Sequence, residues 1–441
     1  NTYSDVLTKE VWIYGLDDDD VFTVKGENKS KLKFRLIGGH GHDTFDVGNQ
    51  KQVIVHDYKS SENTFNLGSK ARQKLTDDYE ENVFLREKTV HNTRLTVPQL
   101  GYNPDDGFLI GGLATFRHKG FYGEDYSTQH IINAGFYFGT KSYNLSYEFA
   151  HADLVGDFNG FARASYKSPS FARNFFGFGN ESENNDSALG KSYNRVRLRD
   201  FEASIGLRRE SKYGSFYELS LNYNALKIKR TSDRYIDAIG NDFEMTDEDF
   251  FSNQNFLDLT ATYQYEGYDD KLAPAKGMNF KVDAGFTHHL SSSDHFYSLE
   301  PSLEFFNPLS RSHRLVLRTQ VQSQLRFKND FNFYHAAHLG ADSGLRAYRR
   351  ERFTGKQTLV GNADVRYAFN EIHTSFLPIQ LGVFGGADLG RVWIPNQDSS
   401  KWHNSYGGGM WINAAELVSG QFNLFHGKDG FHFSFGLTTK F

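Results

Sequence analysis

The stretch Tyr217-Glu-Leu-Ser-Leu-Asn-Tyr-Asn224 decides the fold of this chain. Apolar or aromatic residues occupy every second position and polar residues lie between them, which is the pattern of a β-strand with one apolar and one polar face. The same alternation recurs at residues 144–149, 257–264 and 278–284, and it dominates the chain from about Thr93 onward. We therefore predict an antiparallel sheet that occupies most of the chain.

The composition indicates that this sheet lies in a membrane. Aromatic residues make up 16% of the chain, with 41 Phe and 24 Tyr, yet the mean hydropathy is −0.58. A transmembrane β-barrel reconciles these values, because lipid-facing apolar residues alternate with polar residues that face the lumen. The chain has no run of about 18 apolar residues, which excludes a transmembrane helix. A net charge of −5 argues against a nucleic-acid partner.

The alternating segments often reach ten residues, the length that crosses a bilayer at a tilt. Closing the sheet removes its unpaired edges, which lipid cannot satisfy. At about 20 residues per strand and connection, residues 96–441 predict about 16 strands. The longer polar inserts, residues 180–192 and 229–249, are expected to be extracellular loops. The expected fold is thus all-β, a transmembrane antiparallel β-barrel preceded by a small β-rich domain.

The first part of the chain differs from the barrel. Residues 1–66 contain short strand-like runs broken by Gly and Asp clusters, which predicts a small β-rich domain. Residues 67–95 are highly charged, as in a linker or short helix. The barrel is then expected at residues 96–441.

Two turns of the N-terminal domain resemble each other. Residues 15–22 read Gly-Leu-Asp-Asp-Asp-Asp-Val-Phe, and residues 38–45 read Gly-Gly-His-Gly-His-Asp-Thr-Phe. The second turn matches the calcium-binding β-helix repeat, in which carbonyl and carboxylate oxygens hold the ion. The pattern predicts a calcium site that involves Asp18, Asp20 or Asp43. The alternative is a pair of solvated turns, since neighbouring calcium repeats normally follow each other at about nine residues.

A second stretch, Leu339 to Tyr367, breaks the alternation of the barrel. Its first half is rich in glycine and reads Leu-Gly-Ala-Asp-Ser-Gly-Leu-Arg-Ala-Tyr, which predicts a loop, and residues 359–367 resume the pattern of a strand. The loop carries Arg346 among apolar and aromatic residues. An arginine in this setting is expected to pair with an acid.

At these residues the chain resembles the BamA/TamA superfamily of outer-membrane assembly and secretion barrels, the bacterial surface antigen type. The resemblance runs from about Pro98 to the C-terminus, and residues 98–107, 175–180 and 274–277 also carry it. In that family a loop folds into the lumen and its Leu/Val-Arg-Gly-Phe/Tyr motif pairs with acids on neighbouring strands. Here the motif is Leu-Arg-Ala-Tyr at residues 345–348.

The resemblance assigns a lumenal latch. Arg346 is expected to pair with Asp388 of Gly-Ala-Asp-Leu-Gly, and with Asp364 of Gly-Asn-Ala-Asp-Val-Arg. Two residues depart from the family pattern: Ala347 replaces a glycine, where a left-handed backbone would be strained, and Asp364 replaces a longer Glu. The expected latch residues are Arg346, Asp388, Asp364, Tyr348 and Gly344.

The resemblance also implies a weakly paired seam that admits client polypeptides by β-augmentation. The seam is expected between a first strand at about residues 107–119 and a last strand at residues 431–441. Glycines within these strands would weaken the pairing. The expected seam residues are Gly107, Gly111, Gly112, Gly436 and Phe441. The implied location is the bacterial outer membrane, with the N-terminal domain in the periplasm.

Residues 1–92 lack the βααββ transport repeats of well-known family members. They are similar instead to the β-rich connector of Bacteroidota chains that fuse a metallophosphoesterase to such a barrel, which implies a catalytic domain upstream of Asn1. A passive membrane anchor for that domain is therefore the alternative to polypeptide insertion or translocation.

The sequence contains no pattern for chemistry of its own. It has no Gly-x-Ser-x-Gly elbow, no phosphate-binding loop and no His-Glu-x-x-His, so no catalytic residue is assigned. Apart from calcium, no cofactor is expected. The expected partners are outer-membrane lipid, client polypeptides and other envelope proteins.

Overall fold

The computed structural model describes residues 3, 6–26, 31–85, 92–119, 121, 126–239, 247–271, 273–328, 332–374, 378–414 and 418–439. The chain divides into two compact units. Unit 1 contains residues 1–93 with 117–127, and unit 2 contains residues 94–116 with 128–441.

Unit 1 is a short solenoid of two parallel sheets, in the orders β1-β3-β5-β7 and β2-β4-β6. Parallel pairing stacks Tyr14 on Ile37 and Leu16 on Gly39, so the two glycine-rich turns lie on successive rungs. Phe45, Val53 and Val55 fill the space between the sheets. The bounds are β1 Glu10–Leu16, β2 Val21–Val24, β3 Lys33–Gly39, β4 Thr44–Val47, β5 Val53–Asp57, β6 Thr64–Leu67, β7 Arg72–Leu75 and α1 Tyr79–Asn82.

The boundaries of this unit differ from those expected. β7 and α1 lie in residues 67–95, the stretch predicted to be a linker or short helix; α1 is a short helix there, and β7 pairs with β5. The connection between β9 and β10 also belongs to unit 1: Phe121 is 1% exposed and its ring lies 4.8 Å from that of Trp12. Sequence patterning misses such a segment because it is distant along the chain.

Unit 2 is a closed antiparallel barrel of 16 strands, which confirms the predicted fold and strand number. β13 and β23 are short strands that are not counted among the 16. β13 pairs with β14, as β12 does, and β23 pairs with β24, as β22 does, so each continues a position that a longer strand already occupies. The bounds are β8 Thr93–Asn103, β9 Gly107–His118, β10 Thr128–Tyr137, β11 Ser142–Val155, β12 Phe158–Lys167, β13 Ala172–Asn174, β14 Arg195–Glu210, β15 Ser215–Lys229, β16 Asn253–Tyr268, β17 Gly277–His289, β18 His295–Pro308, β19 Leu315–Arg326, β22 Gln357–Ala368, β23 Ile372–His373, β24 Pro378–Trp393, β25 His403–Ala414, β26 Val418–Gly427 and β27 Gly430–Thr439.

The predicted alternation is visible in β15. Leu219 is 52% exposed on the outer face, whereas the neighbouring Asn222 is 9% exposed and faces inward. Inward charged side chains are paired across strands, as where Glu148 accepts from Arg163 at 2.8 Å and from Arg208 at 2.7 Å. The barrel therefore has an apolar outer band and a polar lining, as lipid requires. Among the described residues, no helix is long and apolar enough to cross a membrane.

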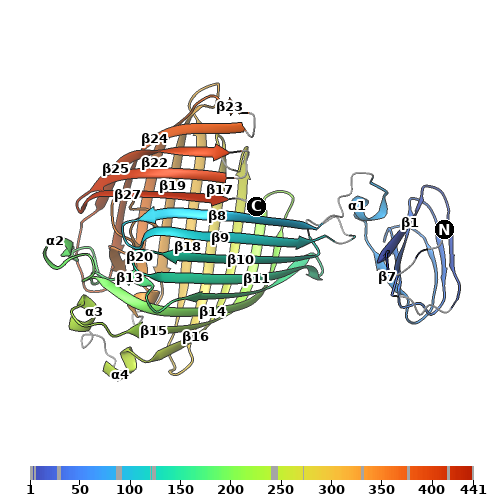
Figure 1. Ribbon diagram of the computed structural model, residues 1–441, viewed down its shortest axis with the longest axis horizontal. Helices are drawn as coiled ribbons and strands as arrows, with labels where there is room; N and C mark the ends of the chain where they lie inside the picture. The colour runs from blue at the N-terminus through green and yellow to red at the C-terminus, as the bar shows by residue number, and fades with distance from the viewer. Residues whose placement is uncertain are drawn as a thin grey trace. The chain divides into compact units, whose positions relative to one another are not determined.

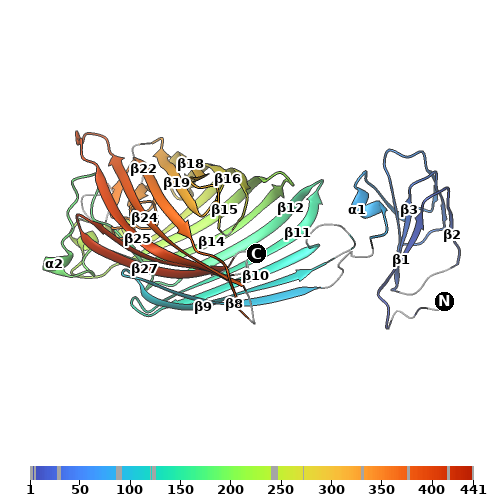
Figure 2. The same ribbon diagram turned by 90° about the horizontal axis from the view of Figure 1, so that it is seen from above.

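The connections at the two ends of the barrel differ in length. Antiparallel order places the short connections 211–214, 269–276 and 309–314 at one end, which we call the turn end. The long connections 168–194, 230–252 and 327–356 lie at the other, the loop end, together with α2 Asp186–Leu189, α3 Tyr235–Ala238 and α4 Asp247–Phe250 (Figure 1). β8 lies between β9 and β27, which closes the ring (Figure 2).

The loop end of the barrel interior is packed with buried side chains. At the loop end, Phe175, Phe250 and Phe333 of three separate connections join wall residues in one buried cluster. Beside it, residues of the connection 327–356 form a second cluster with Phe384 and Phe425 of the wall. This connection carries the predicted latch.

Candidate functional site

The predicted latch lies in the connection between β19 and β22. This connection contains the short helix η2 (Phe333–His335) and a small hairpin, β20 (Ala337–Leu339) and β21 (Phe353–Gly355). We call residues 340–352, between the two hairpin strands, the inner loop. Leu345 donates its N–H to the carbonyl of Gly340 at 2.8 Å, and Gly344 has φ +98°, a backbone conformation that favours glycine. The glycines thus allow the loop to turn back on itself.

Arg346 meets Asp388 of β24. Its Nη2 lies 2.6 Å from Asp388 Oδ1, its Nε 3.0 Å from the same oxygen, and its backbone N–H donates to Oδ2 at 3.0 Å. Asn362 and Ser405 also donate to this carboxylate. The Asp388 side chain is fully buried, so a charged partner with several donors compensates for its lost hydration.

Asp364 of β22 is the second partner of the guanidinium, at 2.6 Å from Nη2. Its shorter side chain reaches because Gly386 faces it on β24: a Cβ on Gly386 would lie 1.9 Å from Asp364 Oδ1. Arg318 of β19 donates to the other oxygen at 2.9 Å. The structure therefore brings together the three charged residues of the predicted latch.

The remaining latch residues pack around this centre. Ala347 is not among the described residues with positive φ, so the departure from glycine is not strained there. Its methyl group instead lies against Gly427, at the end of β26. Tyr348 is 1% exposed and its hydroxyl donates to the carbonyl of Asn404 at 3.1 Å.

Three further arginines of the inner loop were not predicted as site residues. Arg349 Nε lies 2.6 Å from Asp105, and Arg350 pairs with Asp106; both acids are in the turn between β8 and β9. Arg352 Nε lies 2.6 Å from Asp429, in the turn between β26 and β27. The motif around Arg346 gave no signal for these pairs, because their acids are distant in sequence.

The seam differs from the one expected. β27 pairs with β8 rather than with the strand at residues 107–118, which is the second strand of the barrel. Pro98 obscured β8 in the sequence: proline cannot donate to a ladder and is tolerated on edge strands. Among the described residues, the register between β27 and β8 contains only Phe435 opposite Tyr102 and Gly436 opposite Gly101.

The expected seam glycines therefore separate. Gly436 lies at the seam, as predicted. Gly107 ends the turn between β8 and β9 with φ +77°, and a Cβ on Gly111 would meet the carbonyl of Ala134 on β10 at 2.4 Å. Gly112 shares β9 with Gly111, so neither of these two faces β27. Phe441 lies outside the described residues.

The predicted calcium ligands come from the two glycine-rich turns. Asp18 is exposed at the tip of its turn, and Asp43 Oδ1 accepts the backbone N–H of Asp20 at 2.8 Å. Within the described parts of the chain, no group of three or more His, Asp or Glu side chains could hold a metal ion. The calcium site expected at Asp18, Asp20 or Asp43 stays a prediction; the two turns lie on successive rungs, and the Asp43 side chain is buried.

Asp43 instead approaches Asp57, the last residue of β5. Both side chains are fully buried, and a Cβ on Gly38 would lie 2.2 Å from Asp43 Oδ2 and 2.3 Å from Asp57 Oδ2. Neither oxygen has a hydrogen-bond partner. Burial raises the pKa of Asp57 to about 7, and the charge of Asp43 contributes to this rise. The hydrogen bond from the backbone N–H of Tyr58 lowers the pKa and offsets part of the rise. The two acids therefore share one proton when unit 1 is folded near neutral pH.

Comparison with known proteins was consistent with this geometry. Residues 128–438 match the Omp85 superfamily domain. The crystal structure of BamA from Haemophilus ducreyi lacking POTRA domains 1-3 is similar, with a TM-score of 0.56 and 15% identity over 78% of this chain and 70% of that chain. CdiB from Escherichia coli is also similar, with a TM-score of 0.52 and 12% identity over 81% of this chain and 64% of that chain. At these identities the likeness shows the fold alone. No curated protein matched the sequence.

Removing the guanidinium of Arg346 should destabilise the barrel. Arg346→Ala leaves Asp388 and part of Asp364 buried without their charged partner, which costs about 3 kcal/mol. We expect a lower temperature for the loss of the heat-modifiable band on electrophoresis, and faster hydrogen exchange in residues 340–352. Arg163→Ala is the matched control, because Arg163 pairs with Glu148 on the wall and does not touch the inner loop. An inner loop that stays protected in Arg346→Ala would contradict the latch.

The shared proton predicts that unit 1 becomes less stable as pH rises. The pKa of Asp57 in the folded state lies above its unfolded value of about 3.9. Protonation of Asp57 therefore contributes its full stabilisation of unit 1 below about pH 3.9, and this stabilisation is lost as pH rises through about 7. We expect hydrogen-exchange protection of β5, corrected for intrinsic rates, to fall by at least about 1 kcal/mol between pH 5 and 8. Asp57→Asn should remove this decrease in protection, whereas Asp46→Asn, at an exposed position, should retain it. Equal pH dependence in both variants would refute the shared proton.

Proposed function

We propose a function that proceeds from one fact: the chain belongs to the Omp85 superfamily. It is therefore an outer-membrane β-barrel. We propose that this barrel inserts polypeptides into the outer membrane or moves them across it, and that unit 1 lies in the periplasm. Its partners are then client polypeptides and the surrounding lipid.

The short seam carries this proposal. β26 and β27 pair from Val418 to Gly427, whereas β27 and β8 pair only around Gly436 and Gly101 in the described residues. A strand edge with few backbone hydrogen bonds is a template for another strand. Gly436 of β27 lies opposite Gly101 of β8, so no side chains pack against each other at this pair to stabilise the seam. An incoming segment can therefore compete for β8 or β27 by β-augmentation.

The inner loop supplies the closure that the backbone lacks. Arg349 and Arg350 hold the turn that follows β8, while Arg352 holds the turn that precedes β27. The same short segment therefore grips both sides of the seam at the loop end. Arg346 fixes this segment to β22 and β24, away from the seam. In the proposed mechanism, release of the inner loop frees the two hairpins to separate.

A passive anchor is the second candidate. Unit 1 consists of parallel solenoid sheets and has no βααββ repeat in its described residues. An anchor would hold this domain, and a catalytic domain upstream of it, at the membrane without opening the seam. The two functions differ in whether other outer-membrane proteins depend on this chain.

Depletion of the protein separates these candidates. If the barrel inserts or moves polypeptides, depletion should lower the amounts of other envelope proteins, measured by quantitative proteomics of isolated outer membranes. An unchanged outer-membrane profile would support the anchor.

A crosslink across the seam tests the mechanism in the same cells. The chain contains no cysteine, so Gly101→Cys with Gly436→Cys introduces a single pair at opposed positions. We expect the oxidised pair to fail in restoring the depleted proteins and to recover with reductant. Ser204→Cys with Asn222→Cys, which opposes two positions within the continuous wall, should restore them in both states. Full restoration by the oxidised seam pair would contradict the mechanism.

A further inference from the structure

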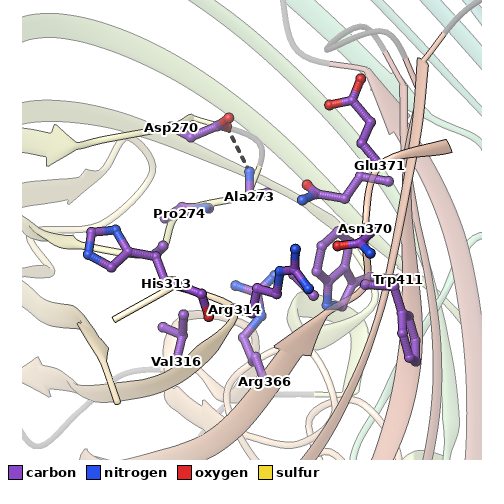
Figure 3. A pocket seen from close by; sticks show the side chains of 15 residues that line it. Asp270, Ala273, Pro274, His313, Arg314, Val316, Arg366, Asn370, Glu371 and Trp411 are labelled. Carbon is purple, nitrogen blue, oxygen red and sulfur yellow. Dashed lines mark hydrogen bonds between the residues drawn. The ribbon is translucent and has the colours of Figure 1, made fainter. Parts of the chain in front are cut away.

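A cavity of about 320 Å³ opens at the turn end of the barrel, away from the inner loop. It is lined by residues of the connections 269–276, 309–314 and 369–377, and by the ends of β22 and β25 that lie at the turn end. Arg314, Arg366 and Trp411 meet in its middle (Figure 3). The cavity belongs to neither the latch nor the seam.

Arg366 projects into this cavity from β22 without an acid to receive it. Within the described chain its side chain forms no hydrogen bond or ion pair, and its guanidinium carbon lies 5.4 Å from the ring centre of Trp411 and 5.5 Å from that of Phe306. The nearby acids serve other arginines. Glu304 accepts from Arg318 at 2.6 Å, and Asp364 accepts from Arg318 and Arg346. Arg366 is therefore left with its donors available.

Trp411 adds a second donor without an acceptor. Its side chain packs over Gly382, where a Cβ would lie 2.1 Å from the indole, and the residue is 6% exposed. Trp411 lines the cavity, and its indole Nε1 is buried without a hydrogen-bond partner. Burial of a donor without a partner is unfavourable, so an acceptor that reached this nitrogen would be favoured.

The other charged groups of the lining do not change the sign of the site. Arg314 lies beside Arg366 and adds positive charge. Asp270 accepts the backbone N–H of Ala273 at 2.9 Å, and Glu371 lies 3.4 Å from His373. Both acids therefore have partners. The lining thus presents the side-chain donors of Arg366 next to the Trp411 ring.

We propose that this cavity binds a carboxylate, with Arg366 and the Trp411 indole as its donors. A guanidinium presents two parallel N–H groups that match the two oxygens of a carboxylate. The neighbouring indole N–H completes a three-donor site in a cavity large enough for the end of a peptide.

The source of the carboxylate is an extended polypeptide, which presents this group at its C-terminus and on Asp and Glu. That source rests on the proposed function, because it requires a polypeptide at the turn end of the lumen. The carboxylate chemistry rests only on the cavity. A negative binding result would therefore leave the insertion mechanism standing, and a failed depletion experiment would leave the site standing.

Fluorine NMR of the full chain in detergent, labelled with 5-fluorotryptophan, reads the site directly. The chain has four tryptophans, and Trp411→Phe identifies the resonance. The probes are acetyl-triglycine with a free carboxylate, its amide, and inorganic phosphate. We expect the free carboxylate to shift the Trp411 resonance saturably, and the amide to leave it unchanged. Arg366→Gln should weaken binding at least about tenfold.

Arg391→Gln is the matched control, since Arg391 also lies over tryptophan rings, at the loop end, and should not alter binding. Equal shifts with acid and amide, no shift with either, or unchanged affinity in Arg366→Gln would overturn the proposal. A response to phosphate but not to the peptide would also overturn it. If Arg366→Gln does not fold, Arg366→Lys decides: it keeps the charge but loses the paired donors, so undiminished affinity would overturn the bidentate site.

Discussion

A guanidinium can remain inside a barrel only if carboxylates meet it there, and the arrangement of this lumen follows from that constraint. Arg346 places the inner loop against β22 and β24, because Asp364 and Asp388 are the acids that compensate for its lost hydration. Once the loop is placed, Leu345 and Tyr348 fill the space beside the wall. The barrel interior is thereby packed, and the arginines that follow are directed toward the strand ends.

This placement links the lumen to the seam. Arg352 reaches the last hairpin, whereas Arg349 and Arg350 reach the first, so one loop spans both sides of the point where the barrel closes. In the described residues, backbone pairing at the seam is limited to two opposed positions, and β8 includes Pro98, which cannot contribute a ladder hydrogen bond. In the mechanism that we propose, closure depends on side-chain ion pairs, which can be exchanged without breaking the barrel wall. A continuous ladder would not allow this.

The sequence predicted the features that depend on local pattern. Alternation around Tyr217 identified the barrel wall, the glycine-rich loop singled out Arg346, and the family resemblance assigned both of its acids. The missed features depend on residues that only folding brings together. Pro98 hid the first strand, and the partners of Arg349 and Arg352 come from distant turns. In unit 1 the repeated turns were recognised, but the approach of Asp43 to Asp57 was not, because parallel stacking brings these two acids together.

If the inner loop holds the seam closed, the distance across the seam should depend on its ion pairs. Spin labels on β8 and β27 report this distance by pulsed electron spin resonance. We expect one narrow, short distribution in the unsubstituted chain. With Arg352→Ala we expect a broader distribution that extends to longer distances, while Arg163→Ala leaves the distribution unchanged. An Arg352→Ala distribution that coincides with that of the unsubstituted chain would show that the inner loop does not hold the seam closed.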